Sequence, residues 1–185
     1  MTAEESAASA PALGRGQHAG GEVAVLLSAS AVSLLCLLHA GLSGRGALEA
    51  FVGFVLVRLA AIDVRLRILP DRIVLPATAV TLVAQAALAP ERTPEWLLAA
   101  LGASLFLLVP ALIRPEALGM GDVKLALLLG AALGRGVVTA LTLGLLAAGG
   151  YAALLLLVQG RRALKSTMPL GPFLALGGIL ALLGR

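Results

Sequence analysis

The sequence predicts an all-α protein, a polytopic bundle of transmembrane helices. Of its 185 residues, 59% are hydrophobic and only 13% are charged, and the mean hydropathy is +1.01. A soluble domain of this size keeps a large surface and could not hide so many apolar side chains. The apolar residues also gather in stretches close to the roughly 20 residues that a helix needs to cross the hydrocarbon of a bilayer. These observations together predict about seven spans.

The N-terminal segment differs from the rest of the chain. Residues 1–21 are rich in Ala, Gly and Ser with scattered charge, a composition typical of a disordered tail. We expect no cleavable signal peptide, because no basic segment followed by an apolar core begins near residue 1. Residues 22–185 are expected to form the membrane domain.

Seven apolar segments follow the tail, and each is interpreted as one span. They cover residues 23–42, 47–64, 72–89, 95–113, 120–134, 136–159 and 170–184. The fifth segment is short, and only Gly134-Arg135-Gly136 separates it from the sixth. We divide the two there because one unbroken helix would greatly overshoot the bilayer. The prediction is a six-span core with one additional N-terminal span.

The distribution of Lys and Arg predicts the orientation, since cytoplasmic loops carry an excess of both. With the N-terminus inside, nine basic residues lie on the cytoplasmic side and four lie outside. The inside set is Arg15, Arg65, Arg67, Arg72, Arg114, Lys124, Arg161, Arg162 and Lys165, and the outside set is Arg45, Arg92, Arg135 and Arg185. Arg58 remains within the second span, where it either snorkels to the interface or has a function. We therefore expect a multi-pass protein of the inner (plasma) membrane with a cytoplasmic N-terminus.

Two further features exclude other classes of protein. The net charge of +4 comes from basic residues in short loops between apolar segments, which argues against a nucleic-acid partner. The single cysteine, Cys36, lies in an apolar segment and excludes an intrachain disulfide or a CxxC zinc module. We expect Cys36 to be a small buried side chain.

The chain has three aspartates, Asp63, Asp71 and Asp122. The orientation above puts Asp63 at the cytoplasmic end of the second span and Asp122 at the cytoplasmic start of the fifth, although it was derived without them. Two carboxylates at one site share a proton, so one can activate a water while the other polarises a scissile carbonyl. Such a pair hydrolyses peptides without a metal or cofactor. The helix dipoles predict that Asp63 holds the proton and that Asp122 is ionised.

Each aspartate also has a simpler interpretation. Asp122 could be a helix N-cap, and Asp63 could be an interfacial residue paired with Arg65 or Arg67. Asp71 follows a proline at the start of a helix and is interpreted as a cap. Other hydrolase classes have less support, because the chain contains neither an HExxH nor a GxSxG motif.

Three motifs resemble those of the type IV prepilin peptidases. Gly119-Met120-Gly121-Asp122-Val123-Lys124 is similar to their Gly-x-Gly-Asp-Val-Lys signature, and Asp63–Asp71 resembles their motif of an aspartate, basic residues and a proline-containing turn. Pro169–Gly177 is similar to their Pro-x-Gly-Pro-Phe-Leu-Ala-x-Gly stretch. The resemblance covers about residues 47–184. Presenilin-type proteases share the Gly-x-Gly-Asp motif, but the Pro-Ala-Leu motif that they carry near the C-terminus and their Tyr-Asp pair are absent here.

The resemblance implies an aspartyl endopeptidase that removes basic leader peptides from prepilins or pseudopilins at the cytoplasmic membrane face. It gives Asp63 and Asp122 the catalytic roles. It implies a site-shaping role, without chemistry, for Gly119, Gly121, Lys124, Pro169, Gly171 and Pro172. The expected partners are these substrates and the lipid bilayer, with no nucleic acid, metal or cofactor.

One departure from the family pattern concerns a second activity. Members that also methylate the new pilin N-terminus carry a cytoplasmic domain with paired CxxC motifs, whereas this chain has a single cysteine. The resemblance therefore implies a short, peptidase-only form. Two alternatives stay open, namely a catalytically inactive scaffold for pilus assembly and a small transporter. A transporter more often has broken midplane helices or a deep acidic residue, and these aspartates lie at the membrane rim.

Small residues are abundant in the fourth and sixth spans. They are Ala99, Ala100, Gly102, Ala103, Gly144, Ala147, Ala148, Gly149 and Gly150. Such residues let helices approach closely, and the sequence leaves open whether the neighbour is a substrate or another helix of the chain.

Overall fold

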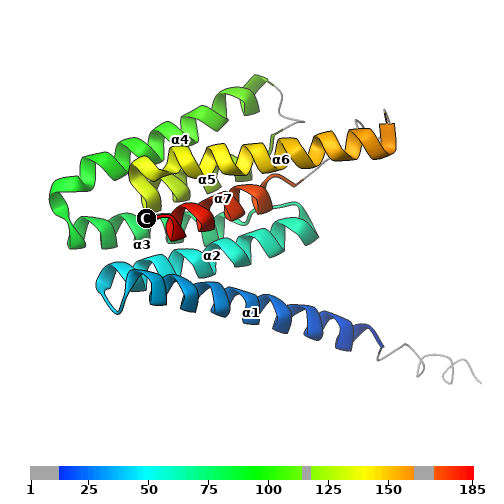
Figure 1. Cartoon of the computed structure of the whole chain (residues 1–185), viewed down its shortest axis with the longest axis horizontal. Helices are drawn as coiled ribbons and strands as arrows, with labels where there is room; N and C mark the ends of the chain where they lie inside the picture. The colour runs from blue at the N-terminus through cyan, green and yellow to red at the C-terminus, as the bar shows by residue number, and fades with distance from the viewer. Residues whose placement is uncertain (1–12, 114–117, 161–168) are drawn as a thin grey trace, which may run out of the picture.

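The computed structural model describes residues 13–113, 118–160 and 169–185, with side chains from residue 21 onward. Each of these parts is helical, as predicted, with short turns between the helices within it (Figure 1). The α-helices are α1 (Leu13–Ala40), α2 (Gly44–Leu66), α3 (Asp71–Leu88), α4 (Thr93–Ile113), α5 (Met120–Leu133), α6 (Val137–Gln159) and α7 (Gly171–Leu183). Two 3₁₀ turns, η1 (Pro90–Arg92) and η2 (Gly134–Gly136), precede α4 and α6.

Several of these helices are long and apolar enough to cross a membrane, which makes this a multi-pass membrane protein. Within the described residues there are four such stretches, Gly21–Ala40, Asp71–Leu88, Pro90–Ile113 and Met120–Gln159, and the shorter apolar helix α7. Helix α2 has 23 residues but carries more charge, including Glu49, Arg58 and Asp63.

The stretch Met120–Gln159 contains the break that the sequence predicts. Helix α5 ends at Gly134, whose φ of 54° and ψ of −128° favour a residue without a side chain. The turn η2 then reverses the chain, and α6 runs back alongside the bundle (Figure 1). The division into two helices is therefore confirmed.

The helices run lengthwise in Figure 1, and the chain reverses at each connection. As a result, α2 and α4 end, and α3, α5 and α7 begin, towards the right-hand side of that view, and α6 extends beyond them on the same side. We call this the site end, and we call the opposite end, which contains η2, the far end. The cytoplasmic location predicted for the site end stays a prediction, and Arg114, Arg161, Arg162 and Lys165 lie outside the described residues.

The N-terminal boundary differs from the expectation. Helix α1 begins at Leu13, inside the stretch expected to be a disordered tail, and its apolar part begins at Gly21. Residues 1–12 lie outside the described residues. Cys36 on α1 is buried, as expected.

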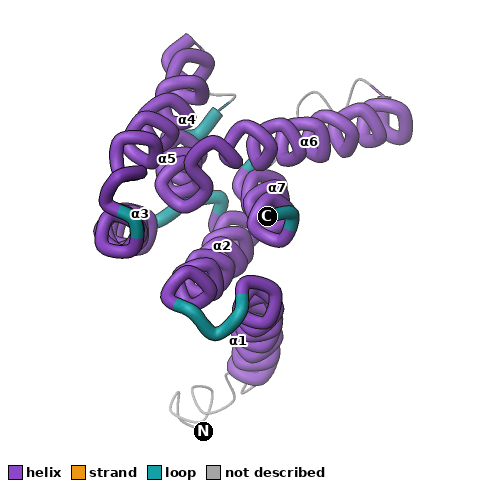
Figure 2. Tube along the Cα trace, turned by 60° about the vertical axis from the view of Figure 1, so that its left-hand side comes forward, coloured by secondary structure: helices purple, strands orange, loops and turns teal. Residues whose placement is uncertain are grey.

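Helix α5 lies at the centre of the bundle (Figure 2). Its leucines Leu125, Leu128 and Leu129 have no exposed surface. At Gly130 the backbone of α4 lies so near that a Cβ atom would overlap Ala99 and Ala100. The small residues of α4 therefore serve, in part, to seat that helix on α5. The central position of α5 fixes where its first turn, which contains Asp122, can lie.

Candidate active site

The end of α2 carries the first candidate residue, Asp63. Helix α2 terminates at Arg67, whose left-handed φ of 52° stops the helix and whose backbone N–H donates to the Asp63 carbonyl at 2.8 Å. Asp63 therefore lies in the last helical turn. Only 6% of its surface is exposed, so its carboxyl group has little contact with solvent.

The start of α5 carries the second candidate, Asp122. Gly119 is the N-cap residue of α5, so Asp122 is in the first helical turn and is not itself the cap. Its exposed fraction is 8%. The carboxyl groups of Asp122 and Asp63 are near enough to interact electrostatically. The structure therefore brings together the two aspartates that the sequence pairs.

A backbone donor from a third segment completes this cluster. The N–H of Gly171, the first residue of α7, donates to Oδ2 of Asp63 at 3.1 Å. The first N–H groups of a helix have no partner inside the helix, so they are available to an acceptor. Gly171 is buried, and a Cβ atom there would lie 2.5 Å from Asp63 Oδ2 and 3.0 Å from its Cγ. Glycine at this position is therefore required for the contact.

The motif residues around Gly171 place the start of α7. Pro172 is in the first helical turn, where its missing N–H costs no hydrogen bond. The ring of Phe173 packs on Tyr151 of α6 with a centroid distance of 5.5 Å. Pro169 is half-buried in the preceding turn. These residues lie next to Gly171, the donor to Asp63, at the start of α7.

The glycines before Asp122 make room for neighbouring segments. A Cβ atom on Gly121 would lie 2.8 Å from the Cβ of Leu69, so the turn after α2 packs directly on the start of α5. Gly119 lies beside the Asp122 carboxylate, with 3.7 Å from an added Cβ to Oδ2. Both glycines thus lie at the site, as the family motif implies.

The interpretation of Asp71 as a helix cap is wrong. Pro70 occupies the cap position of α3 and no side chain caps it, whereas Asp71 is the first helical residue. Its carboxylate accepts a hydrogen bond from Lys124 Nζ at 2.6 Å. Lys124, interpreted only as site-shaping, therefore links the start of α5 to the start of α3. Neither local spacing nor helix periodicity could have indicated this pair.

One carboxyl oxygen of the Asp63–Asp122 pair has no hydrogen-bond partner among the described residues. This oxygen is Oδ1 of Asp122, and it is buried. A buried carboxyl oxygen without a donor is costly as a charge and acceptable when the group carries a proton. This atom weighs against the expectation that Asp63 holds the shared proton.

The alternative interpretation of Asp63, as an interfacial residue paired with Arg65 or Arg67, is supported only in part. Arg67 interacts with it electrostatically, but the hydrogen bond to its carboxylate comes from Gly171. Sequence reasoning missed this donor. The Gly-Pro pair that opens α7 is the signal that could have revealed it, because it predicts a helix start with free N–H groups.

Comparisons with known proteins cover two of the three motifs. Neither the curated proteins nor the solved structures include a match to this chain. The model of the Type IV leader peptidase family matches residues 50–158, more than half of the chain. The matched region contains Asp63, Gly119, Asp122 and Lys124, and it ends before the segment that contains Gly171. The chain therefore belongs to the type IV leader peptidase family.

Proposed function

We propose that this protein is a membrane aspartyl endopeptidase that removes the leader peptides of type IV prepilins or pseudopilins. The observation that supports this most strongly is the meeting of Asp63 and Asp122, two buried carboxyl groups from family motifs, at one end of the bundle. The proposed topology has seven spans with the N-terminus inside, which puts the site end at the cytoplasmic face.

In the proposed reaction the two aspartates hold one proton between them. The ionised carboxylate takes a proton from a water molecule, and the resulting hydroxide attacks the scissile carbonyl carbon. The protonated carboxyl group donates a hydrogen bond to the carbonyl oxygen as negative charge develops there. The proton taken from the water then passes to the leaving amine as the C–N bond breaks. The Gly171 N–H holds Asp63 in a fixed orientation during these steps.

The reaction proposed for this chain ends at cleavage. Methylation of the new N-terminus is not part of the proposal, because the paired CxxC motifs associated with it are missing from a sequence with one cysteine.

Co-expression of the protein with a prepilin, followed by detection of the shortened product, tests the proposal. We expect cleavage with the wild-type protein and its loss in both Asp63→Asn and Asp122→Asn, with each variant still present in the membrane. Cleavage at the wild-type rate by either variant would refute the paired-aspartate mechanism. No cleavage by the wild-type protein of any prepilin would favour the scaffold alternative.

A further inference from the structure

A cavity of about 600 Å³ lies between α4 and α6, away from the aspartates. Its wall on α4 extends from Glu95 to Phe106 and its wall on α6 from Val137 to Leu145, with Gly134 and Arg135 of η2 at the far end. The lining is apolar apart from Glu95, Arg135 and Thr142. Figure 2 shows α4 and α6 diverging from one another on either side of α5.

The packing of the bundle explains this opening. Gly130 of α5 admits the backbone of α4, whereas Gly144 of α6 meets the backbone of α7 at Phe173 and Leu174. Helices α4 and α6 are thus drawn towards different neighbours. Gly102 faces the space that remains, and a Cβ atom added there would meet nothing within 4 Å. The described residues therefore leave this groove unfilled.

The length of the groove matches one leaflet of a bilayer. The walls run over 12 residues of α4 and nine residues of α6, which at about 1.5 Å per residue is roughly 15 Å. The hydrocarbon of a bilayer is about 30 Å thick, so the groove reaches from the interface to about the midplane. An extended acyl chain of one leaflet has this length.

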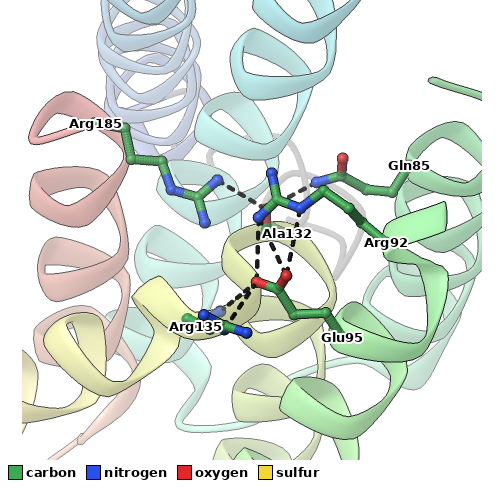
Figure 3. A network of polar contacts seen from close by, with 6 residues as sticks. All are labelled: Gln85, Arg92, Glu95, Ala132, Arg135 and Arg185. Atoms are coloured by element: carbon green, nitrogen blue, oxygen red, sulfur yellow. Dashed lines mark hydrogen bonds and ion pairs between the residues drawn. The ribbon is translucent and has the colours of Figure 1, made fainter. Parts of the chain in front are cut away.

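The mouth of the groove carries charged side chains of both signs, Glu95 and Arg135. The Glu95 carboxylate accepts bonds from Arg92 at 3.2 Å and lies 3.8 Å from Arg135 Nε (Figure 3). Two guanidinium groups thus face one carboxylate. The Arg135 side chain is 90% exposed, so its guanidinium group is accessible to an anion at the membrane interface.

We propose that the groove between α4 and α6 binds one anionic phospholipid of the outer leaflet, with an acyl chain along Gly102 and the phosphate at Arg135. The inference rests on the orientation given with the proposed function, which puts η2 outside. The lipid would fill the opening between two helices that have little contact with one another. Because the groove lies at the far end, its occupant leaves the reacting groups untouched.

Native mass spectrometry of protein released from nanodiscs that contain phosphatidylglycerol and phosphatidylcholine tests the proposal. We expect the wild-type protein to retain one phosphatidylglycerol in preference to phosphatidylcholine. In Arg135→Gln this preference should fall by about tenfold, as expected for the loss of a charge-assisted hydrogen bond. Arg45→Gln is the matched control, because Arg45 is exposed at the same end but does not line the groove, and it should retain the preference.

A second pair of variants tests the groove itself. Gly102→Leu should abolish lipid retention by filling the space, whereas Gly149→Leu should retain the lipid. Both glycines face open space, so both variants can fold. Lipid retention by Gly102→Leu equal to wild type would overturn the proposal, and so would equal retention of the two lipids by the wild-type protein.

The same variants separate this inference from the proposed peptidase activity. Gly102→Leu should cleave a prepilin at the wild-type rate, because the groove is remote from the aspartates. Slower cleavage with unchanged lipid retention would mean that the groove receives the substrate helix, which contradicts the lipid proposal. Retention of phosphatidylglycerol by a protein that cleaves no prepilin would refute the proposed function alone.

Discussion

At the scale of single residues, the site depends on a contact between two residues that lie far apart in the sequence. Asp63 is oriented by the N–H of Gly171, and the space for that bond exists only because residue 171 lacks a side chain. The spacing of the aspartates along the sequence predicts that they lie at one membrane face. It carries no information about this donor, because 108 positions separate the bonded residues.

Replacement of Gly171 tests its role as a positioning residue. In Gly171→Ala the new Cβ would press on the Asp63 carboxyl group and displace it, so we expect kcat for prepilin cleavage to fall by about 10²-fold. KM should change little, because the contact is with a reacting group and not with the remainder of the substrate. Gly102→Ala is the control, since its Cβ meets open space. An equal fall in both variants would point to a general loss of folding.

The ion pair between Lys124 and Asp71 should contribute much less to the cleavage rate than Gly171 does, and little to stability. The Asp71 side chain is 55% exposed, and exposed ion pairs contribute about 0–1 kcal/mol. We therefore expect Asp71→Asn to lower the free energy of unfolding by no more than this and the cleavage rate by at most about fivefold. Thermal unfolding in detergent and steady-state kinetics measure the two effects. A loss as large as that of a catalytic aspartate would mean that Asp71 belongs to the reacting set.

At the scale of the helices, most of the architecture could be predicted from hydropathy. The segments placed α2 to α7 to within a few residues, and the break at Gly134–Gly136 followed from bilayer thickness together with the Gly-Arg-Gly sequence there. The start of α1 at Leu13 was missed because an Ala- and Gly-rich stretch lacks the apolar signal used to find spans. The contacts between helices could not be predicted from the sequence either, because small residues permit close packing without specifying which helix is the partner.

The structure now assigns different roles to two glycines of α6. Gly144 packs against α7, with 2.9 Å from an added Cβ to the Phe173 carbonyl oxygen, whereas Gly149 faces open space. Gly144→Val should push the start of α7, and with it the Gly171 donor, away from Asp63. We expect Gly144→Val to lower kcat at least tenfold, as a displacement of the site predicts, and Gly149→Val to keep it. Similar kinetics for the two variants would show that the position of α7 does not control the site.

At the scale of the whole molecule, the site end brings together three segments that are remote in sequence. The end of α2 and the starts of α5 and α7 meet because consecutive helices alternate in direction (Figure 1). Such alternation is what hydropathy and loop charge can predict, and it was sufficient to place both aspartates at one membrane face, whereas their role as a pair rested mainly on the family motifs. Hydropathy and loop charge could not predict the lateral arrangement of the helices, which leaves α4 and α6 apart.

The proposed orientation can be measured by cysteine labelling. Cys36 is 1% exposed and is the only cysteine, so a Cys36→Ala background leaves no other thiol. A membrane-impermeant maleimide applied to spheroplasts should label Arg135→Cys, at the far end, and leave Arg65→Cys, at the site end, unlabelled until the membrane is opened. The reverse pattern would place the aspartates outside and contradict cleavage at the cytoplasmic face.

The central claim is that Asp63 and Asp122 act as one catalytic unit. Its most direct test is the single-turnover rate of prepilin cleavage by purified Asp63→Asn, Asp122→Asn and the double variant in nanodiscs, with Asp71→Asn as the control. Each single change should lower the rate by at least about 10²-fold, the size of a lost acid–base contribution. The double variant should be no slower than the slower single variant, because groups that act as a unit are not additive. Losses that multiply in the double variant, or cleavage at the Asp71→Asn rate by either single variant, would contradict the shared mechanism.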